Sequence, residues 1–505
     1  MNTKPLSIPA FARQRYLVTA ESIELGTLLA LITFYAIGDF FFEESYDVIN
    51  LVGPVALSAI LAFGIWHQLR TDPENIWTAL FAFRVSTLSY FGLGSLVHMF
   101  ISPEARAYIE AFYAFSDSEI ARLNLILSCC VFLVLLSSRS VQLLLAGHSS
   151  RAPARRNDEM RAARIKNYGI AFFVIGASIK YLWVFPFNMG WVTSAVPGAI
   201  VSLSATSLCG IYLLTIWSLS TRHAMFPFVC FIVTIEILMG LVLFSKTEAL
   251  LPLLVFLMAL VIQKPTYKRM LFAVCMVGVF MNIMQPLIGY SRDQFWLRSS
   301  GSGQMDVSDR LEILGSYFDT SRATVDESAG LTSPLMRMSY VNSATFAIAM
   351  YDRGFPGNSF QNTLSTLVPR MLWEDKPVFN QGQEFAVLAT GYEANNSVSP
   401  GLFAEAYWNF GWLGIPFVMI PLGVILALLS NYNLVMLTRD EWLFLPILFI
   451  NMRLGLSVDG QFTTAVFGTC VLVIVLHYCV RIVLALMQRI GLEPHRRSER
   501  SLIRP

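Results

Sequence analysis

The chain has 505 residues, of which 55% are apolar and only 14% are charged, and its mean hydropathy is +0.57. A soluble domain of average composition carries about 25% charged residues. Charge this sparse over so long a chain excludes disordered, collagen-like, disulfide-scaffold and nucleic-acid-binding proteins. The composition therefore favours a polytopic membrane protein, for which the position of each charge matters more than the net charge of +2.

Apolar stretches of roughly 20 residues, long enough to cross the hydrocarbon core of a bilayer, recur about twelve times. We predict membrane-spanning helices over 22–41, 50–69, 76–100, 121–146, 167–187, 191–219, 224–244, 248–263, 269–290, 402–430, 442–456 and 463–487. The predicted fold class is thus an all-α polytopic membrane protein of about 12 transmembrane helices. Nine spans form a membrane domain over 1–290, and three more lie within 400–487.

Basic residues predict the orientation of these spans, because Lys and Arg accumulate in short cytoplasmic loops. The segment 148–166 is the strongest such marker, with six basic residues at Arg151, Arg155, Arg156, Arg161, Arg164 and Lys166. Counting spans from this segment places the amino terminus and the basic tail 488–505 on the same side. We therefore predict that both termini are cytoplasmic.

The same count places residues 291–399 outside the membrane as one extracytoplasmic loop of about 109 residues. Helical patterns occur near 306–320, 359–368 and 381–390. A further amphipathic helix is predicted to begin with Pro334 at its first position and to stop at Gly354. The loop is therefore predicted to be a small helical domain that rests on the membrane domain. Its cations include Arg292, Arg337, Arg370 and Lys376.

Four ionisable residues fall well inside predicted spans, at Arg84, Lys180, Glu236 and Arg453. Each costs about 2.5–3.5 kcal/mol at a helix centre facing lipid, so they should face the bundle interior or a wet cavity. The simplest interpretation is a structural ion pair of Glu236 with Lys180 or Arg84. Arg453 lies near the outer face together with Lys246, at the level of the loop arginines, which suggests one site at the outer interface.

One stretch of sequence carries a family resemblance. Residues 399–414 read SPGLFAEAYWNFGWLG, and they follow a Pro-Arg…Lys-Pro segment that contains Arg370 and Lys376. Together these segments resemble the Wzy-type oligosaccharide repeat-unit polymerases, which make O-antigen and exopolysaccharide and are related to the O-antigen ligases. Those enzymes also have many spans and one large periplasmic loop late in the chain. The loop lacks the histidine that the related ligases use.

The resemblance implies a GT-C-like membrane glycosyltransferase in the bacterial inner membrane, with the large loop in the periplasm. Its expected activity is transfer of a growing glycan from polyprenyl pyrophosphate to a new lipid-linked repeat unit. The expected partners are this lipid-linked oligosaccharide, membrane lipids, and the chain-length regulator and flippase of the same pathway. No cofactor and no metal are expected, because arginines would stabilise the pyrophosphate leaving group.

The candidate site residues follow from this reaction. The catalytic candidates are Arg370 and Arg292, as cations beside the leaving group, and Glu405, as the acceptor of the hydroxyl proton. The substrate-binding candidates are Lys246, Lys376, Tyr407, Asn409, Arg453 and Arg337. Glu405 also has a structural interpretation, as a charge that favours the amino end of its helix.

Other functions remain open at this point. A secondary transporter or flippase of a glycolipid or a small anion would have a similar number of spans, although such proteins tend to show two similar halves. A lipid-linked-glycan ligase would share the leaving-group chemistry with a different acceptor. A membrane scaffold without activity is the third alternative, and the intramembrane charges weigh against it.

Overall fold

The computed structural model of the protein is helical throughout its described part, in which no strand occurs. The described residues are 10–41, 46–100, 103, 106, 116–146, 158–192, 196, 198–221, 224–264, 266–298, 305–320, 339–361, 363, 373, 381–390 and 398–489. Ten of their helices are long and apolar enough to cross a membrane, and two shorter apolar helices cover Thr206–Ser220 and Phe226–Val242. Each of these twelve helices overlaps one of the twelve stretches expected from hydropathy, and ten of them reach spanning length.

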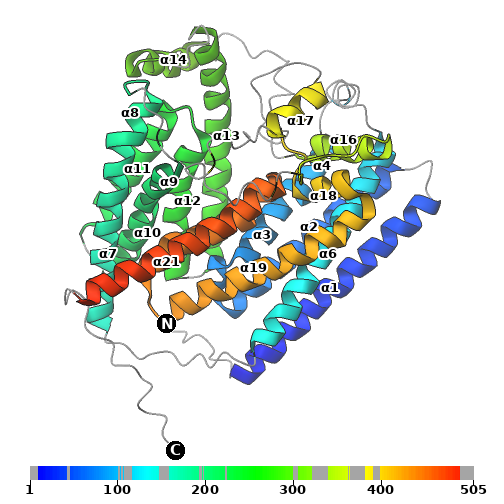
Figure 1. Ribbon diagram of the computed structural model, residues 1–505, viewed down its shortest axis with the longest axis horizontal. Helices are drawn as coiled ribbons and strands as arrows, with labels where there is room; N and C mark the ends of the chain where they lie inside the picture. Colours follow the sequence, from blue (N-terminus) through cyan, green and yellow to red (C-terminus); the bar gives the residue numbers. More distant parts are fainter. Residues whose placement is uncertain are drawn as a thin grey trace, which may run out of the picture.

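The helices form two groups that lie side by side (Figure 1). One group contains α1 (Ala10–Phe41), α2 (Tyr46–Thr71), α3 (Ala79–Thr87), α4 (Gly94–Phe100), α6 (Asp117–Ala146), α18 (Leu402–Phe410) and α19 (Gly414–Thr438). The other contains α7 (Asp158–Ile179), α8 (Phe185–Asn188), α9 (Gly198–Ser204), α10 (Thr206–Ser220), α11 (Phe226–Val242), α12 (Lys246–Gln263) and α13 (Tyr267–Arg298).

The last two helices connect these groups. α20 (Leu445–Leu456) packs along α3 of the first group and also contacts α10 of the second. α21 (Gly468–Arg489) packs against α20. Amide side chains fix α19 in place, because Asn433 donates to the carbonyl of Trp77 at 2.6 Å and accepts from Asn451 at 2.7 Å. Buried polar pairs of this kind specify which helices meet.

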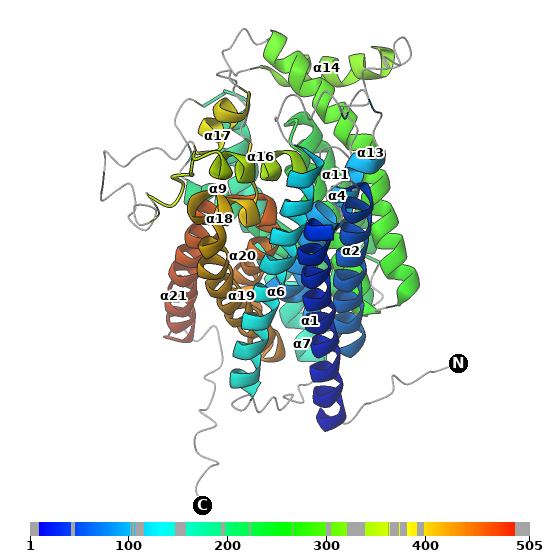
Figure 2. The same cartoon turned by 90° about the vertical axis from the view of Figure 1, so that its right-hand side faces the viewer.

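Three helices of the predicted loop cap one end of the molecule: α14 (Val307–Thr320), α16 (Val341–Asp352) and α17 (Gln381–Thr390). α1 begins at the opposite end (Figure 2). The helices predicted near 306–320 and 381–390 therefore correspond to α14 and α17. Near 359–368, residues 359–361 form a turn and residue 363 is 3-10 helical, while residues 362 and 364–368 lie outside the described part, so the helix expected there stays a prediction.

Two boundaries differ from the sequence prediction. The ninth span was expected to end at 290, but α13 continues to Arg298. No glycine or proline interrupts 291–298, and buried residues of α13 pack beside Phe244. The sixth span was expected to run from 191 to 219. The helix in that region is broken into α9 and α10 at Ala205. Pro334 lies outside the described residues, whereas the stop at Gly354 is observed, with φ of 87°.

Candidate functional site

α18 is a short helix whose position is set by a glycine at each end. Gly401 precedes it with φ of 76°, and Gly411 follows it with φ of 59°. Both values fall in the left-handed region, which glycine adopts without steric cost. A Cβ atom at Gly401 would also lie 2.9 Å from the ring of Phe91. The motif residues of 399–414 therefore lie on and around a short helix that is bounded by a glycine at each end.

Glu405 projects from α18 into the protein interior and is fully buried. Its Oε2 atom accepts a hydrogen bond from the backbone N–H of Phe462 at 2.6 Å. Its Oε1 atom is buried and has no hydrogen-bond partner of normal geometry, and the nearby Ser359 hydroxyl interacts with the same carboxylate as a donor. Buried polar atoms are nearly always satisfied, so the free oxygen indicates a position where a ligand group belongs.

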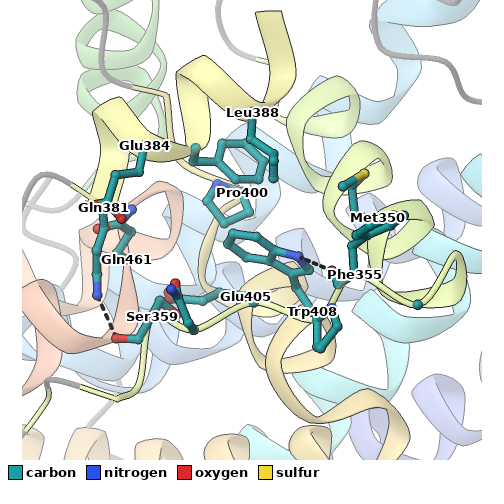
Figure 3. A pocket seen from close by; sticks show the side chains of 15 residues that line it. Met350, Phe355, Ser359, Gln381, Glu384, Leu388, Pro400, Glu405, Trp408 and Gln461 are labelled. Atoms are coloured by element: carbon teal, nitrogen blue, oxygen red, sulfur yellow. Dashed lines mark hydrogen bonds between the residues drawn. The ribbon is translucent and has the colours of Figure 1, made fainter. Parts of the chain in front are cut away.

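A cavity of about 400 Å³ borders Glu405 (Figure 3). Its walls come from the end of α16 and the following turn, from α17, and from α18. This volume lies within the range of about 300–1,000 Å³ that is usual for small-molecule sites. The lining residues with polar side chains are Asn358, Ser359, Gln381, Glu384, Glu405, Trp408 and Gln461.

Gln381 is the second lining residue with an unsatisfied oxygen. Its Nε2 atom donates to the carbonyl oxygen of Ser359 at 2.7 Å (Figure 3). Because a carbonyl oxygen only accepts, this contact fixes which amide atom is the oxygen. The Oε1 atom of Gln381 is buried without a partner. Two orphan acceptors, from α17 and α18, thus line one cavity.

Asn409 helps to hold the wall of the same cavity in place. It lies one turn after Glu405 on α18 and donates both to the carbonyl of Glu405 and to the Ser359 hydroxyl, each at 2.9 Å. Thr463 also donates to the Ser359 carbonyl, at 3.2 Å. Asn409 therefore positions Ser359 beside Glu405.

Tyr407 points to a different set of partners. Its hydroxyl donates to Asp352 at 2.9 Å and accepts from Arg122 at 2.8 Å, and Arg122 also pairs with Asp352 at 2.9 Å. This triad ties α18 to α16 and α6. The side chain of Arg122 is 41% exposed. No local pattern points to this arginine, which is separated from Tyr407 by 285 residues.

The cations Arg292 and Lys246 lie in the other helix group. Arg292, on α13, donates to the carbonyl of Phe244 at 2.8 Å, just beyond α11, and Lys246 is the first residue of α12. In Figure 1, α14 lies over the upper end of the group that contains α13, whereas α16 and α17 lie over the group that contains α18. The structure therefore brings Glu405 and Asn409 together but assigns Arg292 and Lys246 to separate surroundings.

The buried Arg310 reinforces that second cap. It donates to the carbonyls of Met305, Val242 and Asn188 at 3.2–3.3 Å and stacks on the rings of Phe244 and Phe295. Burial lowers the pKa of its guanidinium. Arg310 thus attaches α14 to the carboxyl ends of α8 and α11, where a positive charge is favoured.

The remaining predicted cations fall into two classes. Arg453 is an exposed residue near the end of α20. Arg370, Arg337 and Lys376 lie outside the described residues. Among the residues that the structure describes, no group of three or more His, Cys, Asp or Glu side chains is arranged to hold a metal ion.

Three of the four intramembrane charges predicted from sequence form ion pairs. Lys180 contacts Glu236 at 2.7 Å, which is one of the two pairings expected for Glu236, and Lys180 also contacts Glu248 at 2.8 Å. Arg84 pairs instead with Glu24, through two hydrogen bonds of 2.9 and 2.8 Å. These pairs join helices within each group and account for the charges structurally.

Comparisons with known proteins identify the family to which the chain belongs. No curated protein and no solved structure matches the chain. A family model described as "Domain of unknown function (DUF8712)" matches residues 159–480, more than half of the chain. The matched stretch contains α16, α17 and α18 and therefore the whole cavity beside Glu405. The chain accordingly belongs to the DUF8712 family.

Proposed function

We propose that the protein polymerises lipid-linked oligosaccharide repeat units at the outer face of the bacterial inner membrane. The observation that carries the proposal is Glu405, a fully buried carboxylate with one unpartnered oxygen, which faces a cavity of about 400 Å³. Glu405 belongs to the stretch 399–414 that resembles the Wzy-type polymerases. Many apolar helices with a helical cap at one end, as in a GT-C-like enzyme, agree with this proposal.

The reaction joins two lipid-linked glycans. A hydroxyl oxygen of the new repeat unit attacks C1 of the growing glycan and forms the new glycosidic bond. The bond from C1 to the pyrophosphate oxygen breaks, and polyprenyl pyrophosphate leaves with the bonding electrons. Glu405 accepts the proton of the attacking hydroxyl through its Oε1 atom, while the Phe462 N–H holds Oε2 in place.

The pyrophosphate leaving group requires fixed positive charge. Arg370 remains our candidate for this role from the sequence, together with Lys376. Arg122 is an additional candidate, because its guanidinium is part-exposed at the capped end of α6 and is oriented by Tyr407 and Asp352. The backbone contact of Arg292 supports a structural role for that residue instead.

The proposal also specifies the orientation in the membrane. α14, α16 and α17 would lie in the periplasm, and both termini would lie in the cytoplasm. The apolar helices around the cavity would hold the polyprenyl tails.

The test is deletion of the gene in its host, followed by separation of the surface or secreted polysaccharide by size. Long chains should vanish while single lipid-linked repeat units persist, and wild-type protein should restore the chains. Glu405→Gln and Arg370→Ala should fail to restore them, since loss of a general base typically costs about 10²–10⁴ in rate. Glu312→Gln is the matched control, because this carboxylate is 70% exposed on α14.

Three outcomes would contradict the proposal. Normal chain length in the deletion strain would overturn it. Accumulation of repeat units on the cytoplasmic side, with none outside, would identify a flippase or transporter. Long chains that remain on the lipid carrier would identify a ligase.

A further inference from the structure

The cavity between α16, α17 and α18 presents hydrogen-bond acceptors that lack donors. Oε1 of Gln381 is buried without a partner, Oε1 of Glu405 is buried with only the Ser359 hydroxyl approaching its carboxylate and no hydrogen bond of normal geometry, and both residues line the cavity. Leaving a buried acceptor unsatisfied costs about 1–3 kcal/mol, and more for a charged group. A ligand that supplies donors at these two points would satisfy both oxygens.

The charge of the lining residues further limits which ligands the cavity can bind. Two carboxylates, Glu384 and Glu405, line the cavity, and none of the described lining residues is Lys, Arg or His. Two like charges about 4 Å apart repel by about 4 kcal/mol at an effective dielectric constant of 20. A carboxylate or phosphate group on the ligand would therefore be disfavoured here.

The third feature is an apolar wall. Trp408 lines the cavity and is held by its own Nε1–H, which donates to the carbonyl of Phe355 at 3.1 Å. A Cβ atom at Gly357 would lie 2.6 Å from the Trp408 ring, so only glycine at this position leaves the indole in place. A fixed aromatic side chain next to unsatisfied acceptors suits a ring with an apolar face and hydroxyl groups along its edge.

We propose that this cavity binds one uncharged, hydroxyl-rich sugar residue, which donates hydrogen bonds to Glu405 and Gln381. The assignment rests on the proposed function in one respect: this sugar would be the acceptor end of the incoming repeat unit, whose hydroxyl reacts. A sugar that bears a carboxylate or phosphate is excluded from this position. The pyrophosphate groups consequently bind elsewhere on the protein.

The variant Glu405→Gln changes one atom of this site. The Phe462 N–H is a donor, so the amide oxygen takes the place of Oε2 and the NH₂ group takes the place of Oε1. An acceptor in the cavity is thereby replaced by a donor without a change of shape. Gln381→Met removes the second acceptor at similar side-chain length. Glu312→Gln repeats the first change at an exposed position outside the cavity.

The experiment measures binding to the full-length protein in lipid nanodiscs by saturation-transfer difference NMR. The probes are methyl glycosides of glucose, galactose, mannose and N-acetylglucosamine, together with the methyl glycosides of glucuronic and galacturonic acid. We expect at least one neutral glycoside to bind and both uronic acid glycosides to bind at least roughly tenfold more weakly than that glycoside. We expect Glu405→Gln and Gln381→Met to weaken the neutral glycoside about fivefold or more and Glu312→Gln to leave it unchanged.

The result that overturns the proposal is absence of binding by every neutral glycoside, or a uronic acid glycoside that binds as tightly as the neutral glycoside. Wild-type affinity in both cavity variants would overturn it as well. The comparison of neutral and acidic probes on the wild-type protein decides the question even if a variant fails to fold. No glycan transfer occurs in this assay. Failure of the chain-length experiment therefore removes the polymerase function and leaves the sugar site to be judged by binding.

Discussion

The ion pair between Glu24 and Arg84 allows a sharp prediction about stability. Both side chains are 3% exposed, and two hydrogen bonds of 2.9 and 2.8 Å join them. Glu24→Gln removes the negative charge that is hydrogen-bonded to the buried guanidinium, while the coulombic interaction of Glu21 with Arg84 remains. Breaking a buried pair from one side costs about 3–5 kcal/mol, because the remaining charge stays uncompensated. We expect destabilisation of this size.

Replacement of the whole pair should behave differently. The double variant Glu24→Leu with Arg84→Met removes both charges and keeps apolar volume, and such replacements are often neutral or stabilising. The assay is thermal unfolding of the purified protein in nanodiscs, where Glu24→Gln should lower the midpoint by several degrees and the double variant should recover most of that loss. An unchanged midpoint in Glu24→Gln, or a double variant as unstable as the single one, would refute the reasoning.

Three further predictions concern single residues. Gly64→Ala should lower the unfolding midpoint, because its Cβ would lie 2.4 Å from the carboxylate of the buried pair, whereas Gly26→Ala, with no atom within 4 Å, should be neutral or stabilising by up to about 1 kcal/mol. Gly357→Ala should weaken binding of neutral glycosides in the NMR assay by displacing Trp408, and unaltered binding would argue against that wall. Arg310→Met should speed amide hydrogen exchange across α14, and unchanged exchange would show that its three carbonyl contacts are dispensable.

Hydropathy predicted where the ten helices of spanning length lie, because each one must bury or shield a long apolar stretch regardless of its neighbours. The same reasoning placed α14 and α17, whose amphipathic patterns are local. It missed the extension of α13 to Arg298, since the polar residues after 290 read as the start of a loop although they also favour helix. The end of α13 therefore follows the helix propensity of the residues after 290 and not their hydropathy.

The candidate site was only partly visible in the sequence. Glu405 and Asn409 stand out because they share one motif on α18. Gln381 carries no such signal, and its importance arises from contact with Ser359 and from the burial of its oxygen. Glu24 as the partner of Arg84 is likewise a long-range contact. Local sequence patterns identify charges that are unfavourable inside a membrane, but they do not show which charges form ion pairs.

The two buried ion pairs also constrain the order in which the chain can mature. Glu24 is separated from Arg84 by 60 residues, and Lys180 is separated from Glu236 by 56. At a synthesis rate of about 5–20 residues per second, the first charge of each pair waits roughly 3–12 s for its counterion. During this time α1, or the segment after α7, carries an unpaired charge that lipid does not tolerate. We therefore expect each of these helices to stay beside the insertion machinery, or at its polar edge, until the later helix arrives.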